Sequence, residues 1–349
     1  MILVYAKQMK KILSVLSVLV FSGWAGAFDT WWHAESTRVA MTQNGFSADA
    51  RLATQVSNYF TDFISVKESY SEAYPILRQM PFPSEPSYDF MHFDAVFGVK
   101  NIENNWQYLL NNTIRTLQMY NSDKSLPAGY RLVVLFNILG ASLHVVQDFY
   151  SHSNWLESYT KLGQKPIPIW FAISPSERAK LSLDTGAYPA GSAPGKPDHD
   201  DLNKDASHRP LNLQAVEVAT RASVDWVSRL IKSTPNLPWA ELQKYDVQKN
   251  MLLRNFLYQL DASFLTSSSI AFGHFDGIHP AKFVFAADGN LEREENMAKQ
   301  VLLRIMPQYL SNIKQSGLPS PYWVGFLKYR IVNELAIGLY KNDKIYIRQ

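Results

Sequence analysis

The chain has 349 residues, of which 46% are hydrophobic and 19% charged, so its composition is that of a folded globular protein and not of a disordered one. It contains no cysteine, which excludes disulfide cross-links and thiol catalysis. Without the three lysines of its first 27 residues, 31 basic residues balance 31 acidic ones. A global basic field for nucleic acid is therefore absent, although a local basic patch is not excluded.

Residues 1–27 have the pattern of a secretory signal peptide. The three lysines precede the apolar run ILSVLSVLVF, and the segment ends with Ala25 and Ala27 at Ala-x-Ala spacing. The alternative is an uncleaved membrane anchor, but the run is shorter than the roughly 20 residues that a spanning helix needs. We expect cleavage before Phe28, and hence a secreted or periplasmic protein.

From residue 28 onward the apolar spacing is helical nearly throughout. Gly45 suits a left-handed helix ending, and Ser47 can cap the next helix. The segment from Tyr130 to His152 is apolar nearly all round, which is typical of a central, buried helix. Helices are expected over residues 33–45, 48–66, 102–120, 130–152, 211–233, 239–260, 291–315 and 322–341.

Residues 163–210 differ from the rest because proline, glycine and serine recur, with a short helical signal only near SERAKL. A loop of this length in a compact fold usually serves as a lid or a binding loop. No repeat, strand-rich section or Gly-rich phosphate loop occurs. The expected fold is an all-α multi-helix bundle, with a helical domain over residues 28–234 and a C-terminal helical extension over 235–349 packed on the same core.

The segment LHVVQDFYSHSNW places His144, Asp148 and His152 at steps of four residues within this apolar helix. Residues at that spacing lie on one helix face. A lone buried histidine is usually a hydrogen-bonded core residue, but a buried carboxylate without compensation would cost several kcal/mol. A divalent metal provides the compensation, and nitrogen and oxygen ligands favour zinc.

The same segment closely resembles the signature of Het-C-like proteins, which are related to zinc-dependent phospholipases C and to fungal single-strand nucleases of the same helical fold. The resemblance covers residues 28 to about 230. It implies a phospholipase C type of helical bundle and a cluster of up to three zinc ions. His152 follows Asp148 by four residues instead of the family's six, which alters the ligand geometry.

The resemblance also implies a zinc ligand at the mature N-terminus, through the α-amine and carbonyl of the first residue and a histidine just downstream. Cleavage would make Phe28 that residue, and His33 follows five positions on. The family usually has tryptophan there, but backbone ligands do not depend on the side chain. The alternative is that His33 merely caps a helix beside Trp31 and Trp32.

Two further ligands follow from the resemblance. Asp62 matches a helix aspartate of the family, and His92 in MHFDA matches its HFD motif, with Asp94 as an orienting neighbour. Asp62, His92 and His144 then form one site, and Asp148 is shared with the site of the mature N-terminus. The alternative for Asp62 is an exposed helix carboxylate with solvent partners.

The partners of His152 are the least determined. The family pattern needs a histidine followed four residues later by a carboxylate, and neither candidate histidine has one. LNKDASHRP resembles a Het-C segment and supports His199 and Asp205 as the pair, with His208 as the alternative. His274 and His279, in GHFDGIH, are more typical of core or loop residues, and a separate small site is the alternative.

These patterns predict an exported zinc-dependent phosphoester hydrolase, most similar to phospholipase C, with Asp62 and Asp148 as its catalytic carboxylates. The expected substrate is a phospholipid or another phosphodiester, with contact to a membrane surface. The alternatives are a single-strand nuclease of the same fold, which the balanced charge disfavours, and a non-catalytic Het-C-like protein acting on membranes or as a toxin.

Overall fold

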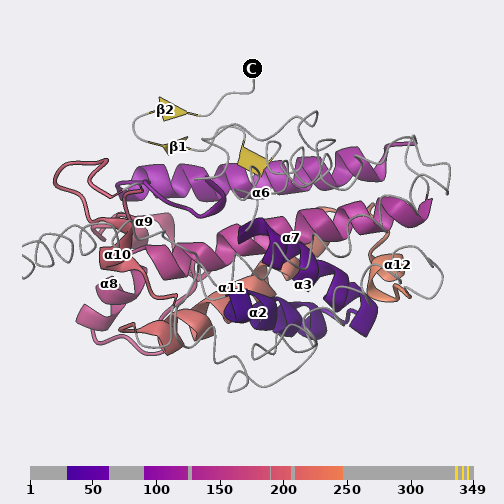
Figure 1. Cartoon of the computed structure of the whole chain (residues 1–349), viewed down its shortest axis with the longest axis horizontal. Coiled ribbons are helices and arrows are strands. Elements are labelled where there is room, and N and C mark those ends of the chain that lie inside the picture. The colour runs from indigo at the N-terminus through magenta and orange to yellow at the C-terminus, as the bar shows by residue number, and fades with distance from the viewer. Residues whose placement is uncertain are drawn as a thin grey trace, which may run out of the picture.

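The structure is a computed structural model, and its central element is the buried helix α7 (Ala128–His152). Three helices cover it, namely α3 (Ala48–Asp62), α6 (Val99–Asn121) and α11 (Asn212–Ser233) (Figure 1). The structure describes residues 30–62, 90–124, 128–188, 190–205, 209–246, 335–336, 340–341 and 344–345. Almost every described side chain of α7 is buried, as expected for a helix that is apolar all round. The described part is all-α apart from one very short hairpin, which confirms the expected fold class.

The other helices and the two strands follow in chain order. Their bounds are α2 Thr30–Gln43, α8 Trp155–Lys161, the 3-10 helix η3 Trp170–Ala172, α9 Pro175–Arg178, α10 His199–Leu202, α12 Trp239–Gln243, β1 Tyr340–Lys341 and β2 Lys344–Ile345.

The junction between α2 and α3 has the two features expected from its sequence. Gly45 adopts a left-handed φ of 80°, and the Ser47 hydroxyl accepts a hydrogen bond from the Ala50 N–H at 3.2 Å. Ser47 also donates from its backbone N–H to the Gln243 carbonyl and from its hydroxyl to the Tyr245 carbonyl. Because these two carbonyls bond to Ser47, α12 ends at Gln243, and residues 244–246 do not extend it as expected. The rest of the helix expected over 239–260 lies outside the described residues.

The C-terminal part of the chain is described only in fragments. The helix expected over 322–341 is wrong at its end, because Tyr340 and Lys341 form β1 and pair antiparallel with β2. Asn342 and Asp343 separate the strands in the sequence, and both residue types favour tight turns. The helix expected over 291–315, and the histidines at 274 and 279, lie outside the described residues.

The Pro/Gly-rich segment packs against the helices in its first half. Trp170 of η3 is buried and stacks on Trp106 of α6 with ring centroids 5.8 Å apart. Isolated bridges then join Asp184 to Phe97 and Thr185 to Ser153. The segment is therefore held beside the C-terminal end of α7, and this places α10 there.

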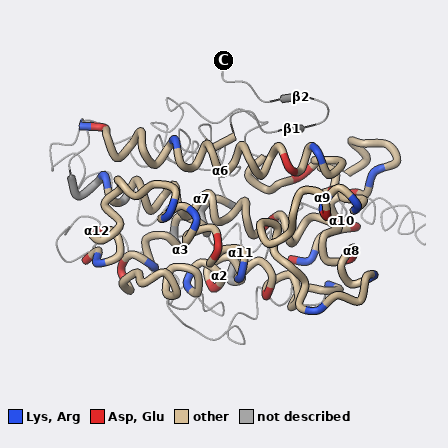
Figure 2. The backbone as a smooth tube through the Cα atoms, turned by 180° about the vertical axis from the view of Figure 1, so that it is seen from behind, with Lys and Arg blue, Asp and Glu red and all other residues tan. Residues whose placement is uncertain are grey.

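Figure 2 shows basic and acidic residues interspersed along the helices, in line with the balanced charge of residues 28–349. Among the described helices, none combines the length and apolar character that crossing a membrane would require.

Candidate metal centre

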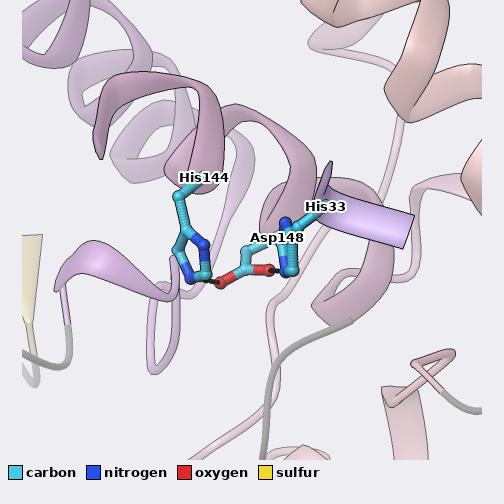
Figure 3. Close-up of side chains that lie close together, drawn as sticks. All are labelled: His33, His144 and Asp148. Carbon is cyan, nitrogen blue, oxygen red and sulfur yellow. Dashed lines mark ion pairs between the residues drawn. The ribbon is translucent and has the colours of Figure 1, made fainter. Parts of the chain in front are cut away.

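The first centre surrounds the carboxylate of Asp148 and is called the Asp148 centre; its members are His33, His92, His144 and Asp148. His144 and Asp148 are one turn apart on α7, and His33 reaches them from α2 (Figure 3). Asp148 Oδ1 lies 3.1 Å from His33 Nε2, whereas Asp148 Oδ2 lies 3.1 Å from His144 Nε2 and 3.0 Å from His92 Nδ1. The side chains of His33, His144 and Asp148 are fully buried.

The spacing of these atoms fits shared metal ligands. Two atoms that each lie about 2.0–2.1 Å from a tetrahedral zinc ion are about 3.3 Å apart. The carboxylate–imidazole distances of 3.0–3.1 Å, and the 3.3 Å between His144 Nε2 and His92 Nδ1, are close to that value. His33, His144 and Asp148 can offer one ligand atom each to a single ion.

The two oxygens of Asp148 face different histidines, as a carboxylate shared between two ions would require. Asp148 Oδ1 is buried and accepts no hydrogen bond from the described residues, although His33 Nε2 is close by. Burial disfavours the charged carboxylate, but His144 and His33, when protonated, outweigh burial and hold the pKa of Asp148 well below its usual range. The site therefore keeps an anionic oxygen ready for a cation.

The segment after His92 connects the first centre to a second one. His92 points to Asp148, and its backbone carbonyl lies 3.0 Å from His152 Nδ1. Phe93 and Ala95 have left-handed φ angles of 55° and 57°, which non-glycine residues rarely adopt. Backbone strain of this kind gathers at functional sites. Here it turns His92 and Asp94 toward the two centres while Phe93 packs against Phe149 in the core.

The second centre surrounds His152 at the end of α7 and is called the His152 centre; its members are Asp94, His152, His199 and Asp205. His152 Nε2 lies 3.2 Å from Asp205 Oδ1, and Asp94 Oδ1 lies 3.0 Å from His199 Nδ1 and 3.4 Å from His152 Nδ1. Asp94, His152 and His199 can offer ligand atoms to one ion. All four residues are buried.

Hydrogen bonding indicates which atoms of the His152 centre face an ion. The His152 Nδ1–H can donate to the His92 carbonyl, and the His199 Nδ1–H to Asp94, so that both Nε2 atoms remain acceptors. In that arrangement Asp205 lies beside the free Nε2 of His152, and Asp94 orients His199, which is the role expected for Asp94. Asp94 as a direct ligand is the alternative that the geometry also permits.

In the absence of metal, the charged groups of the His152 centre form ion pairs between carboxylates and histidines. Burial raises the pKa of Asp94, but His199 and His152 outweigh it and lower the value to about 2. Burial lowers the pKa of His152, but Asp205, Asp94 and Asp148 together raise it well above its usual value. The metal-free centre is thus held together by ion pairs that a cation would replace.

Two features bring α10 and Asp205 to His152. A Cβ on Gly186 would lie 2.5 Å from the Cα of His199, so only glycine allows this approach. The buried Lys204 amine donates to the carbonyls of Ser153 and Leu202 and pairs with Glu157 at 2.9 Å. Burial lowers the pKa of Lys204, and Glu157 opposes this effect. Lys204 therefore ties the segment before Asp205 to α7 and α8.

The predicted ligands divide into those that the structure brings together and those that it leaves outside. His33, His92, His144, Asp148, His152, His199 and Asp205 lie in the two centres. Asp62 is the last residue of α3, but its side chain is not described. Phe28 and His208 lie outside the described residues. Metal ligation by each of these residues stays a prediction.

Sequence reasoning missed the polar residues behind the histidines. His33 Nδ1 lies 2.6 Å from Gln147 Oε1, and His144 Nδ1 lies 3.0 Å from Asn58 Oδ1. Gln147 could have been found from the sequence, because it is an amide residue directly before Asp148 in the apolar helix that carries the predicted ligands. Asn58 is four residues before Asp62 and thus on the same face of α3.

Comparisons with known proteins add little to this geometry. No protein-family profile matches the chain. An alignment of 133 residues is 29% identical to von Willebrand factor A domain-containing protein 7 of Rattus norvegicus, and it covers 26% of this chain and 15% of that protein. The chain thus spans only a small part of this relative. No solved structure matches.

Proposed function

We propose that the protein is a zinc-dependent phosphoester hydrolase with a phospholipase C-like activity. The observation that carries the proposal is the adjacency of two buried His/Asp centres, which share α7 and the His92–Asp94 segment. Zinc ions in paired sites supply a water of lowered pKa and offset charge on phosphoryl oxygens. The sequence resemblance to Het-C-like proteins and zinc-dependent phospholipases C supports the same reaction class.

The chain's own residues have distinct roles in this proposal. Asp148 holds both halves of its centre together through its two oxygens, one of which contacts His33 and the other His144. His92 is the most exposed member of the Asp148 centre, with 23% of its side chain accessible, so the substrate approaches from its side. Asp62 and Asp148 are the proposed catalytic carboxylates, and Phe28 and His33 complete the ligands at the mature N-terminus.

A phospholipid fits this proposal better than a nucleic acid. Binding of a polyanion relies on lysine and arginine, and the described helices carry both signs of charge interspersed (Figure 2). The proposed export of the protein, by cleavage before Phe28, would place it where membrane surfaces are accessible. A single-strand nuclease activity is therefore the less favoured reading.

One observation favours a second function, a structural metal site in a non-catalytic protein. The side chains of His33, His144, Asp148 and His152 have no accessible surface, and catalytic sites keep an open position for water and substrate. A Het-C-like protein acting on membranes or as a toxin would use its metal in this way.

The test is hydrolysis by protein that begins at Phe28, with phosphatidylcholine vesicles and single-stranded DNA as separate substrates. Headgroup release that a chelator and Asp148→Asn both abolish supports the proposal, with Asp225→Asn on α11 as a control outside both centres. Cleavage of DNA alone indicates the nuclease. Bound zinc without hydrolysis of either substrate overturns both enzyme functions and supports a structural role.

A further inference from the structure

We propose that Asn58 and Gln147 are positioning residues that hold His33 and His144 in the tautomer whose bare Nε2 atoms face Asp148. The proposal rests on the metal centre of the proposed function and not on the reaction that it performs. Neither amide is among the predicted ligands. Both are fully buried and lie behind the histidines, on the side away from the carboxylate.

The hydrogen-bond directions begin at Ser223 of α11. Its hydroxyl donates to the Ala219 carbonyl at 2.8 Å, so its oxygen faces Gln147 as an acceptor. Gln147 Nε2 donates to this oxygen at 3.1 Å and to the Thr37 hydroxyl at 3.2 Å. An amide whose nitrogen points to these hydroxyls must turn its oxygen the opposite way.

The orientation of Gln147 determines the proton on His33. Gln147 Oε1 lies 2.6 Å from His33 Nδ1 and accepts from Asn58 Nδ2 at 3.0 Å. An amide oxygen cannot donate, so the short contact requires a hydrogen on His33 Nδ1. In a neutral imidazole the other nitrogen, Nε2, then carries a lone pair.

The orientation of Asn58 determines the proton on His144 in the same way. Asn58 Nδ2 is committed to Gln147 Oε1 and to the Thr37 hydroxyl at 2.8 Å, which turns Asn58 Oδ1 toward His144. Oδ1 lies 3.0 Å from His144 Nδ1. His144 therefore also carries its hydrogen on Nδ1 and presents the lone pair of Nε2.

Both lone pairs are directed at the same carboxylate. His33 Nε2 and His144 Nε2 lie 3.1 Å from Asp148 Oδ1 and Oδ2, and the two rings stack with centroids 4.2 Å apart. These four acceptor atoms converge in a fully buried space and repel one another unless a proton or a metal ion lies among them. The amides thus do more than tie α2, α3 and α7 together, because they direct the Nε2 atom of each ring, and not its Nδ1 atom, at the carboxylate of Asp148.

The first test needs no variant. In metal-free protein with 15N-labelled histidine, the nitrogen shifts of His33 and His144 should show that both rings carry hydrogen on Nδ1. Gln147→Leu should introduce the second tautomer at His33, and Asn58→Leu should introduce it at His144. Ser142→Ala, a buried control on α7 that bonds Trp226, should change neither. An Nδ1 atom without hydrogen on either ring of the unaltered metal-free protein overturns the proposal.

The second test measures zinc directly. Competition with a chelator should show zinc binding weakened about 10–100-fold in Gln147→Leu and Asn58→Leu, and unchanged in Ser142→Ala. If Gln147→Leu and Asn58→Leu fold and bind zinc with unchanged affinity, the two amides have only a structural role and the proposal is wrong. Failure of the hydrolysis assay bears on neither measurement, so the two proposals are distinguishable.

Discussion

Gly140 of α7 lies so close to Asn58 of α3 that a Cβ on Gly140 would fall 2.8 Å from the Asn58 backbone nitrogen. The same Cβ would lie 2.6 Å from the Thr54 carbonyl oxygen, and neither backbone atom can move without its helix. Gly140 is one turn before His144. The close approach that this glycine allows is what places the Asn58 amide against the His144 ring.

Gly140→Ala is expected to force α3 away from α7 and to act on both stability and metal binding. Overpacking of this kind costs about 1–3 kcal/mol of unfolding free energy, measured by urea denaturation of metal-free protein. Zinc affinity should fall as well, because Asn58 moves off His144. If the zinc affinity of a destabilised Gly140→Ala is unchanged, the link between helix spacing and the Asp148 centre is wrong.

Asp148→Asn should remove metal from the Asp148 centre and leave the His152 centre loaded. The asparagine amide lacks the negative charge that attracts a cation to this centre. The contacts of His152 with Asp205 and Asp94 do not involve this side chain. Elemental analysis should show fewer zinc ions per chain than in Asp225→Asn. Equal zinc content in the two variants would exclude Asp148 as a ligand.

Lys204→Met should loosen the segment that carries Asp205. Its amine bonds buried carbonyls and Glu157, so its removal leaves acceptors without donors, at a cost of about 1–3 kcal/mol. Zinc should be lost from the His152 centre first. The control is Lys196→Met, whose half-exposed amine pairs with Asp184 and whose loss should cost less than about 1 kcal/mol. Similar effects of both variants would argue against this role of Lys204.

Metal-free protein should lose stability toward acid through Asp94. The pKa of Asp94 is about 2 in the folded protein against an ordinary value of 3.8. A lowered folded pKa stabilises above the ordinary value, and this contribution, on the order of 2 kcal/mol, is lost as the pH falls toward 2. Urea denaturation across that range should show a smaller loss in Asp94→Asn than in the unaltered chain.

His152 has the opposite effect on the pH dependence of stability, because its pKa is raised in the folded protein. Its protonated form stabilises the metal-free fold at pH values below about 6.5, and that stabilisation disappears as the pH rises through the folded pKa. Zinc requires the unprotonated ring. Zinc binding near neutral pH should therefore release protons, which calorimetry in two buffers of different ionisation enthalpy would detect. Zinc binding without proton release would contradict the paired state of His152.

Protein that begins at Phe28 should bind more zinc than protein with residues left before it. The proposed ligand is the free α-amine of Phe28, and an added peptide bond converts it to an amide that cannot ligate in the same way. Elemental analysis of both forms decides the matter. Identical zinc content would show that His33 acts without a terminal amine.

Local periodicity was enough to predict much of the described fold. The positions of α2, α3, α6, α7 and α11 agree with the expected helices within a few residues at most described ends. One exception has its cause outside the helix itself. At the end of α12 the carbonyls of Gln243 and Tyr245 bond to Ser47, which is about 200 residues away in the sequence. Such a partner has no signature in the apolar spacing of α12.

The sequence alone determined that His144, Asp148 and His152 share one face of α7, because residues four apart in a helix align whatever surrounds it. It could not determine which distant side chains meet them. Packing decided that Asn58 and Gln147 stand behind the histidines and that Asp94 and Asp205 lie beside His152. The physical reason is that helix and loop spacing depends on backbone approach, here at Gly140 and Gly186, and not on periodicity.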